Sequence, residues 1–361
     1  MALFFTKAGF TQPDTINYPV QTLPGSTPVK FAPDIITGFK HSPLIISPDG
    51  NEMYWVETDG TERIKYIQYE SGTWSEPAIA GFVTDFLTSH NGSPVFSPDG
   101  ERLYFNSDRP GGIGSHDVWY VQRDGNGWDT PVNIGAPYNT SDFDVSPVFT
   151  NDSTAYRIGY TDNPAGFTYS GGLFSDSFAI DNHPVSEWYS SVYISPDEEY
   201  VIFAGDNPPD LYIRFKNHEN NWSDPINMGD EINTGESERF PVISPDGKYL
   251  FFLRSEANQN DYFWVSASLI DDLREEVLNI DCRNTGKINV YPNPAQSTIQ
   301  IEYPGQHQNE VIYRIIDLNG KILEQGKLTG KPVDVSGLNT GFYMINLMVD
   351  EKIINSKIIV E

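Results

Sequence analysis

The sequence predicts an all-β protein in which a β-propeller of four-stranded blades is followed by a small β-sandwich domain. Three observations predict it: a turn motif that recurs about every 50 residues, short apolar and aromatic stretches around each copy, and a change in charge near residue 285. A chain of 361 residues is long enough for one large domain and one small domain. The hydrophobic content of 38% is too high for a disordered acidic chain.

The recurring turn has the sequence Ser-Pro-Asp-Gly. Intact copies occupy 47–50, 97–100 and 244–247, and degenerate copies occupy 150–153 and 195–198, so that successive copies lie 45 to 53 residues apart. Proline presets φ at its position and glycine accepts a positive φ. Each copy therefore predicts a tight turn between two strands.

Each turn joins a short apolar stretch to an aromatic stretch, and in most repeats two further β-like stretches follow. The fourth stretch begins at Trp-x-x-Pro, as at Trp74, Trp128 and Trp222. Four strands in roughly 40–50 residues are typical of a propeller blade. The aromatic side chains of the second strands, such as Tyr54 and Trp55, are expected to pack between neighbouring sheets.

The fifth repeat lacks a Trp-x-x-Pro stretch and continues into residues 271–278, which are predicted to be helical. The missing strand is found near the N-terminus, where residues 28–33 align with 131–136 and 225–230. We therefore expect the N-terminal strand to complete the last blade and close the ring, which removes free sheet edges. Five blades are favoured, and a six-bladed alternative stays open if residues 154–184 contain an extra hairpin.

The charge of the chain changes at residue 285. The whole chain has 23 basic and 50 acidic residues and a formal net charge of -27. Residues 1–284 contain 16 basic and 42 acidic residues, a net charge of -26, whereas residues 285–361 contain 7 and 8, a net charge of -1. This shift predicts a domain boundary, with the propeller at 13–284 and the β-sandwich at 285–361.

Four motifs characterise the C-terminal domain. They are Tyr-Pro-Asn-Pro-Ala at 291–295, Asp-Leu-Asn-Gly-Lys at 317–321, Leu-Asn-Thr-Gly-Phe-Tyr at 338–343 and Lys-Ile-Ile-Val at 357–360. Asn319-Gly320 in the second motif predicts a hairpin, because both residues tolerate positive φ. With these motifs the domain resembles the C-terminal sorting domain of cargo of the type IX secretion system of Bacteroidetes. The resemblance implies export through the periplasm, contact with the secretion machinery, and then attachment to the outer-membrane surface or release after cleavage.

The first 12 residues are interpreted as the remnant of a signal peptide. Leu3-Phe4-Phe5 resembles the end of an apolar core, and Phe10-Thr11-Gln12 resembles a stretch close to a cleavage site. An ordinary N-terminus is the alternative. No stretch approaches the about 18 apolar residues of a membrane-spanning helix, so no membrane span is expected.

The large domain has a family resemblance of its own. The Ser-Pro-Asp-Gly strands over residues 28–270, and especially Ser-Asp-Arg-Pro-Gly-Gly at 107–112 with Asp-Val-Trp at 117–119, resemble the TolB-like, WD-repeat-like propeller repeats of bacterial exported proteins. Members of that family are binding and scaffolding proteins, with some enzymes on related propellers. The resemblance therefore implies the fold and leaves the function open.

Composition excludes several classes of function. A net charge of -27 repels phosphate backbones, so nucleic-acid binding is not expected. The single cysteine, Cys282, excludes an internal disulfide and a thiolate metal cluster and is interpreted as an incidental thiol. No serine-hydrolase, zinc-protease or phosphate-loop motif is present, and no catalytic residue is assigned.

The loops that enter each innermost strand share one face of a propeller with the loops between the second and third strands, and ligands usually meet this loop-rich face. A serine that recurs before the inner strands (Ser42, Ser93, Ser146, Ser191) is expected to form hydrogen bonds between blades. Residues that vary from blade to blade are better candidates for ligand contact. The candidate ligand-binding residues are Lys40, His41, His90, Asn91, Arg109, His116, Asp144, Trp188, Tyr189, Glu238 and Arg239.

Aromatic and carboxylate groups around a concave mouth suit an extracellular glycan or another small ligand, because rings stack on sugar C–H groups and carboxylates accept hydroxyl protons. The acidic propeller favours neutral glycans, unless Lys40 with Arg239 supplies a local basic spot. No cofactor is expected, although acidic turns such as Asp142 and Asp144 could hold calcium rather than being simply solvated.

Two alternatives stay open. The same face could degrade a polysaccharide, either as a glycoside hydrolase with Asp144 and Glu238 as its two carboxylates or as a lyase that uses His90, Tyr189 and Arg239. The third hypothesis is a protein–protein scaffold in the cell envelope.

Overall fold

The computed structural model describes residues 16–19, 22–151, 153–158, 164–180, 191–205, 208–217, 221–274, 288–303, 311–317, 321–349 and 352–360, without the side chains of 349 and 352–355. The chain forms two compact units, 1–271 and 272–361. The predicted signal-peptide remnant, the predicted boundary at 284/285, Cys282 and the Asn319-Gly320 turn lie outside the described residues.

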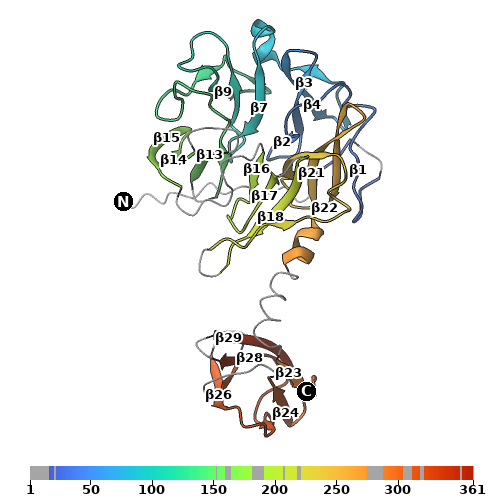
Figure 1. Ribbon diagram of the computed structural model, residues 1–361, viewed down its shortest axis with the longest axis vertical. Coiled ribbons are helices and arrows are strands. Elements are labelled where there is room, and N and C mark those ends of the chain that lie inside the picture. Colours follow the sequence, from blue (N-terminus) through green and yellow to red (C-terminus); the bar gives the residue numbers. More distant parts are fainter. Residues whose placement is uncertain are drawn as a thin grey trace. The chain divides into compact units, whose positions relative to one another are not determined.

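The described part of the first unit contains five antiparallel sheets. Figure 1 shows them following one another around a common centre in the order of the sequence. The first sheet consists of β2 (Ile45–Ile46), β3 (Glu52–Thr58), β4 (Glu62–Glu70) and β5 (Thr73–Trp74), with β6 (Ala78–Ile79) also paired to β4. The second consists of β7 (Asn91–Phe96), β8 (Arg102–Ser107), β9 (Asp117–Asp124) and β10 (Gly127–Trp128), with β11 (Val132–Asn133) also paired to β9.

The other three sheets have four strands each. The third consists of β12 (Val148–Phe149), β13 (Thr154–Arg157), β14 (Ala165–Ser170) and β15 (Leu173–Phe178). The fourth consists of β16 (Val192–Ile194), β17 (Tyr200–Gly205), β18 (Asp210–Phe215) and β19 (Ile226–Asn227). The fifth consists of β20 (Ser237–Ile243), β21 (Tyr249–Glu256), β22 (Gln259–Ser266) and the N-terminal strand β1 (Val29–Lys30). A short 3₁₀ helix, η1 (Gly81–Phe86), precedes β7, and residues 268–274 are helical.

Strand β1 pairs with β22 in the fifth sheet, as the sequence predicts. Val29 lies opposite Trp264 and Lys30 opposite Phe263. The backbone N–H of Phe31 extends the pairing by donating to the carbonyl of Tyr262 at 2.8 Å. The edge of the fifth sheet is thus covered by a strand from the other end of the unit.

The Ser-Pro-Asp-Gly turn is held together by its own side chains. The Ser47 hydroxyl donates to Asp49 Oδ1 at 2.5 Å and accepts the backbone N–H of Glu52 at 2.9 Å. The same pair of contacts recurs at Ser97, Ser195 and Ser244. Gly50 has φ +77°, the left-handed conformation that the motif predicts. The repeat therefore encodes the turn between the first two strands of a sheet.

Apolar clusters lie between consecutive sheets. Buried side chains of the first and second sheets form one cluster, those of the second and third another, and those of the third and fourth a further one. A fourth cluster joins the fifth sheet to the first, through Phe251 and Trp264 on one side and Met53 and Trp55 on the other. Tyr54 and Trp55 are at most 2% exposed, so the predicted packing of these aromatic residues between sheets is confirmed.

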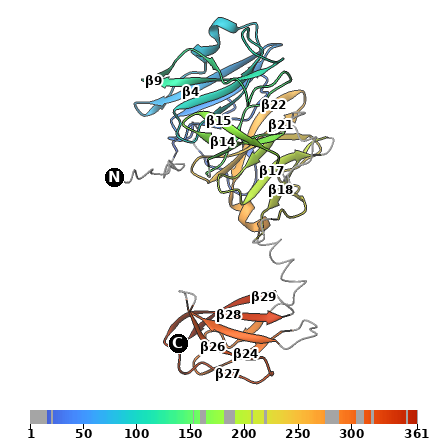
Figure 2. The same ribbon diagram turned by 90° about the vertical axis from the view of Figure 1, so that its left-hand side faces the viewer.

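The second unit is a β-sandwich (Figure 2). One sheet consists of β23 (Asn289–Tyr291), β24 (Thr298–Glu302) and β27 (Val333–Asp334). The other consists of β26 (Ile322–Lys327), β25 (Ile312–Ile316), β28 (Gly341–Val349) and β29 (Lys352–Val360). The Tyr-Pro-Asn-Pro-Ala motif fastens the last strand, because the Asn293 amide bonds to both Lys357 and Ile359 backbone groups and Ala295 is fully buried.

Candidate ligand site at the mouth of a central cavity

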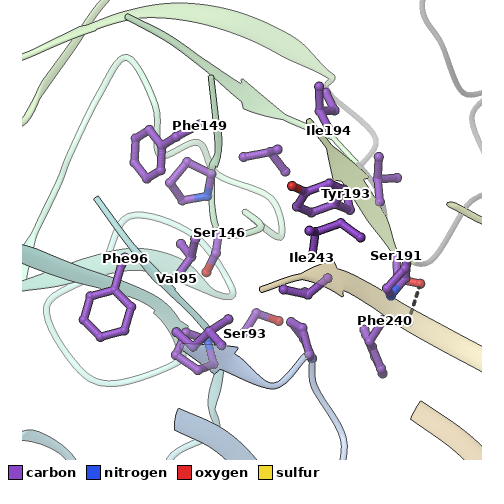
Figure 3. A pocket seen from close by; sticks show the side chains of 18 of the residues that line it. Ser93, Val95, Phe96, Ser146, Phe149, Ser191, Tyr193, Ile194, Phe240 and Ile243 are labelled. Carbon is purple, nitrogen blue, oxygen red and sulfur yellow. Dashed lines mark hydrogen bonds between the residues drawn. The ribbon is translucent and has the colours of Figure 1, made fainter. Parts of the chain in front are cut away.

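A cavity of about 640 Å³ lies where the inner strands of the five sheets meet (Figure 3). Each sheet contributes one apolar side chain at the same position, two residues before the first residue of its turn. These five are Ile45, Val95, Val148, Tyr193 and Val242. The periodicity of the sequence thus builds a lining with one residue from every sheet at this level.

The cavity extends from the turns to the entry loops. Pro48, Pro196 and Pro245 of the turns line one end, and His41, Phe143 and Phe240 of the entry loops line the other. We refer to the entry-loop end as the mouth. It lies on the loop-rich face that the sequence predicts for ligand contact.

A chain of side chains, the mouth cluster, follows the rim of the mouth. It consists of Phe240, His41, Glu62, His90, His116 and Phe143. The ring centroids of Phe240 and His41 are 6.1 Å apart, and His41 Nδ1 lies 2.5 Å from Glu62 Oε1. The other carboxylate oxygen of Glu62 lies 3.9 Å from His90 Nδ1.

The chain continues into the second and third sheets. The rings of His90 and His116 are 5.9 Å apart, and those of His116 and Phe143 are 4.6 Å apart. Side chains from four sheets therefore form one connected set, in which His41 and His90 are 49% and 47% exposed and available to a ligand.

His116 is the most shielded histidine of the cluster. Burial lowers its pKa, and the neighbouring charge of His90 acts in the same direction, whereas Asp108 and Glu62 oppose the shift. Its Nδ1 is buried and has no hydrogen-bond partner among the described residues. The neutral imidazole is therefore the favoured form at neutral pH.

Three polar groups that line the cavity also lack partners within the described part of the chain. They are Asn106 Oδ1, Ser146 Oγ and Arg239 Nε. Asn106 is only 7% exposed. Its side chain packs directly against the backbone of residue 92, which is possible because residue 92 is glycine. A Cβ at that position would lie 2.6 Å from Asn106 Oδ1 and 3.0 Å from Glu62 Oε2. A buried polar atom without a partner has a cost that a ligand can remove.

Two candidate carboxylates belong to the scaffold instead. Asp144 is 1% exposed, accepts the Thr140 N–H at 2.7 Å and lies 3.3 Å from Arg157 Nη1. Burial raises the pKa of Asp144, although Thr140 and Arg157 oppose the shift. Glu238 is fully buried and repeats the arrangement, with Thr234 at 2.7 Å and Arg254 Nε at 2.8 Å.

The position that Asp144 and Glu238 occupy in the entry loops is also buried in the first two sheets, where it is Lys40 and Asn91. Asn91 Oδ1 accepts a hydrogen bond from Arg109 Nη2 at 2.7 Å, and burial lowers the pKa of Arg109 to about 10. Lys40 is 3% exposed and donates to Asp261 of the fifth sheet at 2.8 Å. The structure therefore places these three candidates, together with Asp144 and Glu238, behind the cavity wall, where they hold the entry loops.

The remaining candidates fall into two groups. The first group is at the cavity: His41 and Arg239 line it, and His90 and His116 belong to the mouth cluster. The second group, Trp188 and Tyr189, lies outside the described residues. Sequence reasoning missed Glu62, Asn106, Phe143 and Phe240. The signal for the two phenylalanines was their place in the aligned entry loops, and the signal for Asn106 was the glycine opposite it.

The recurring serines have different roles. Ser42 Oγ accepts the Val56 N–H at 2.8 Å within its own sheet, whereas Ser191 Oγ accepts the Phe240 N–H of the fifth sheet at 3.0 Å. The predicted hydrogen bond between blades is therefore observed at Ser191 (Figure 3).

Within the described ranges, no group of three or more His, Cys, Asp or Glu side chains is placed to hold a metal ion. Likewise, the described helices include none long and apolar enough to cross a membrane.

Residues 289–361 match the secretion system C-terminal sorting domain family. The C-terminal unit is a type IX sorting domain, and it indicates secretion to the cell surface or to the outside. Two of the motifs that predicted this domain contact the last strand, β29. Asn293 hydrogen-bonds to its backbone, and Gly341 lies opposite Val360.

No curated protein sequence matches the chain. Similar solved structures include a TolB protein from Agrobacterium tumefaciens (13% identity, 81% of each chain covered, TM-score 0.37). They also include PorZ, a surface component of the type IX secretion system of Porphyromonas gingivalis (13%, 89% of this chain and 45% of PorZ, TM-score 0.37). A third is an exo-β-1,3-galactanase from Clostridium thermocellum (11%, 92% and 82%, TM-score 0.40). These similarities are too weak to transfer a function.

Proposed function

We propose that this protein is an exported five-bladed propeller, closed by β1, that binds a neutral extracellular glycan at the mouth of its central cavity. The observation that carries the proposal is the mouth cluster, in which aromatic rings, imidazoles and a carboxylate form one connected set whose members His41, Phe143 and Phe240 line the opening. Five sheets in sequence order, with β1 paired to β22 and a shared core between the fifth and first sheets, support the closed ring.

The chemistry of the cluster suits a sugar. Phe143 and Phe240 offer apolar ring faces for C–H groups, and Glu62 and the imidazoles offer acceptors and donors for hydroxyl groups. The net charge of -27 disfavours polyanionic glycans through long-range repulsion. A neutral oligosaccharide avoids that repulsion and uses the same contacts.

The test is a glycan array with the full chain, followed by calorimetric titration of the best neutral oligosaccharide. Phe240→Ala and His41→Ala should each weaken binding about tenfold, because each removes a ring contact at the rim. Phe178→Ala is the matched control, since Phe178 is 43% exposed on the outermost strand of the third sheet and should leave affinity unchanged. Equal affinity in all variants would place the glycan elsewhere, and no binding at all would remove the glycan proposal.

A polysaccharide lyase is the second candidate. It is favoured by His41 Nδ1 and Glu62 Oε1 at 2.5 Å, since a carboxylate that orients an imidazole is an arrangement of general-base catalysis. Arg239 at the same mouth could neutralise a uronate. A lyase predicts growth of unsaturated-uronate absorbance that Glu62→Gln abolishes, and a flat trace over a uronate-containing panel excludes it. A hydrolase that uses Asp144 and Glu238 has no comparable support, because buried arginines occupy both carboxylates.

A further inference from the structure

The interior of the cavity differs chemically from its mouth. The level formed by Ile45, Val95, Val148, Tyr193 and Val242 consists of four aliphatic side chains and one aromatic ring, and the neighbouring lining positions include Pro94, Pro147 and Pro241. Figure 3 shows Val95, Tyr193 and Phe240 arranged around the same space, although they come from three different sheets. A cavity of about 640 Å³ is in the size range of small-molecule sites.

Only two described lining residues carry a formal charge, Asp197 and Arg239. Asp197 belongs to the turn end, and its carboxylate is bonded to Ser195 Oγ at 2.6 Å and to the backbone of Glu199 at 3.2 Å. Arg239 belongs to the mouth end. Its Nε is buried and has no hydrogen-bond partner among the described residues.

The contrast with the arginines that bond to entry-loop side chains is informative. Arg157 and Arg254 each reach a buried carboxylate, and Arg109 reaches Asn91. Arg239 is the one arginine of this set that lines the cavity, and it is also the one whose Nε has no partner in the described structure. A cationic group at the end of an apolar channel favours an anion there.

We propose that the central cavity binds a fatty-acid-like carboxylate, with the alkyl chain along the channel and the carboxylate on Arg239. The unpartnered Ser146 hydroxyl near the same end can donate to the carboxylate, and the apolar level below excludes water from the chain. All five sheets contribute a side chain to that level, so an alkyl chain there would contact residues of every sheet. The carboxylate end of this site adjoins the rim where the glycan is proposed to bind, whereas the alkyl chain lies deeper, in the interior of the cavity.

The probe is a polyene fatty acid whose fluorescence rises in apolar surroundings, titrated into the full chain beside the alcohol of equal length. Wild-type protein should saturate and should prefer the acid over the alcohol. Arg239→Gln should weaken acid binding about 10–100-fold and remove that preference, because it deletes a charge-assisted contact. The control is Arg63→Gln, since Arg63 is an arginine that pairs with Asp59 outside the cavity.

A second pair of variants tests the channel itself. Val148→Phe and Val242→Phe place a ring in the apolar level from two different sheets, and each should abolish binding of both acid and alcohol. Val132→Phe on β11, where Val132 is 47% exposed, is the matched control and should bind as wild type. Circular dichroism and thermal melting of every variant exclude unfolding as the cause of a loss.

Three results would overturn the proposal: no saturable binding by wild type, unchanged acid affinity in Arg239→Gln, or unchanged affinity in both folded channel variants. Phe240→Ala and His41→Ala distinguish this site from the rim, because they should impair the glycan far more than the fatty acid. Loss of one ligand with retention of the other therefore separates failure of this inference from failure of the glycan proposal.

Discussion

The two ends of the inner strands are built on opposite rules. At the turn end the same four residues recur in three of the five sheets, and the serine and aspartate oxygens hydrogen-bond to one another and to backbone N–H groups. At the mouth most residues differ from sheet to sheet, and polar atoms of Asn106, His116 and Arg239 have no partner in the described structure. Repetition therefore marks the scaffold, whereas the varied residues at the mouth include polar atoms that a ligand can bond.

The entry loops qualify that rule. Asp144 with Arg157 and Glu238 with Arg254 differ in sequence but have the same architecture, a carboxylate held by a threonine four residues earlier and by a buried arginine. The arginines come from different positions of the second strands, so the repeat is hidden in the sequence. Variation between blades can thus conceal a shared structural role.

The largest expected effect comes from breaking one of these buried pairs. Glu238→Ala removes the nearer and fully buried counter-ion of the Arg254 guanidinium, leaving only the partly exposed Glu256 at 3.7 Å, and should lower the free energy of unfolding by about 3 kcal/mol. His41→Ala at the mouth also breaks a contact to a carboxylate, but His41 is 49% exposed, so the loss should be about 1 kcal/mol or less. Urea denaturation of both variants measures the difference.

A double variant tests the cause. Replacing both partners, as in Glu238→Leu with Arg254→Met, removes the uncompensated charge and should recover much of the stability lost in Glu238→Ala. If the double variant is less stable than either single variant, the buried charge is not the source of the loss. If Glu238→Ala costs no more than His41→Ala, Glu238 is not part of the scaffold.

The next largest effect is expected at the turns. Gly50→Ala forces an alanine to φ +77° and places its Cβ 2.8 Å from Ile16 Cγ1, so it should cost roughly 2 kcal/mol or more. Gly247→Ala has a similar φ of +71° but open space around the new Cβ, and it should cost only about 1 kcal/mol. Equal losses in chemical denaturation would show that the contact with Ile16 does not matter.

The fold was readable because its signals are local and periodic. Proline and glycine in the turn, alternating apolar residues and the alignment of residues 28–33 with 131–136 predict which strands pair, and β1 does pair with β22. The sorting domain was equally readable, because its motifs are short runs of adjacent residues. Asn293 and Ala295, both in the Tyr-Pro-Asn-Pro-Ala motif, hydrogen-bond to the last strand.

The site was readable only in part, because it depends on distances across sheets. The sequence indicated that His41, His90 and His116 share one face, but it could not show that Glu62 on β4 links the first two. It also could not distinguish Glu238 behind the wall from Arg239 on it, since adjacent residues of a strand point to opposite sides. Contacts between side chains of different sheets do not recur at a fixed spacing in the sequence, so the sequence pattern does not predict them.

Gly92→Ala should have a small effect on stability and a larger one on binding. The new Cβ would lie 2.6 Å from Asn106 Oδ1 and 3.0 Å from Glu62 Oε2, and both are ends of side chains that can move aside. We expect a loss of about 1 kcal/mol or less in stability and about tenfold in glycan affinity. Gly235→Ala, with open space around its Cβ, is the control and should change neither. A large loss of stability with normal affinity would make Gly92 a packing residue only.

The smallest effect concerns His116 and pH. Because the folded state lowers its pKa below the ordinary value of 6.5, the unfolded chain binds more protons in the window between the two values, and stability rises with pH across that window. The contribution of His116 is therefore complete above pH 6.5 and decreases as the pH falls towards the lower pKa of the folded state. His116→Gln cannot be protonated, so its unfolding free energy should decline less than that of wild type on acidification. Facing groups Glu62, His90 and Asp108 are present in both proteins, so the difference between the two curves isolates His116. A constant difference from pH 8 to pH 5 would show that His116 titrates alike in the folded and unfolded chains.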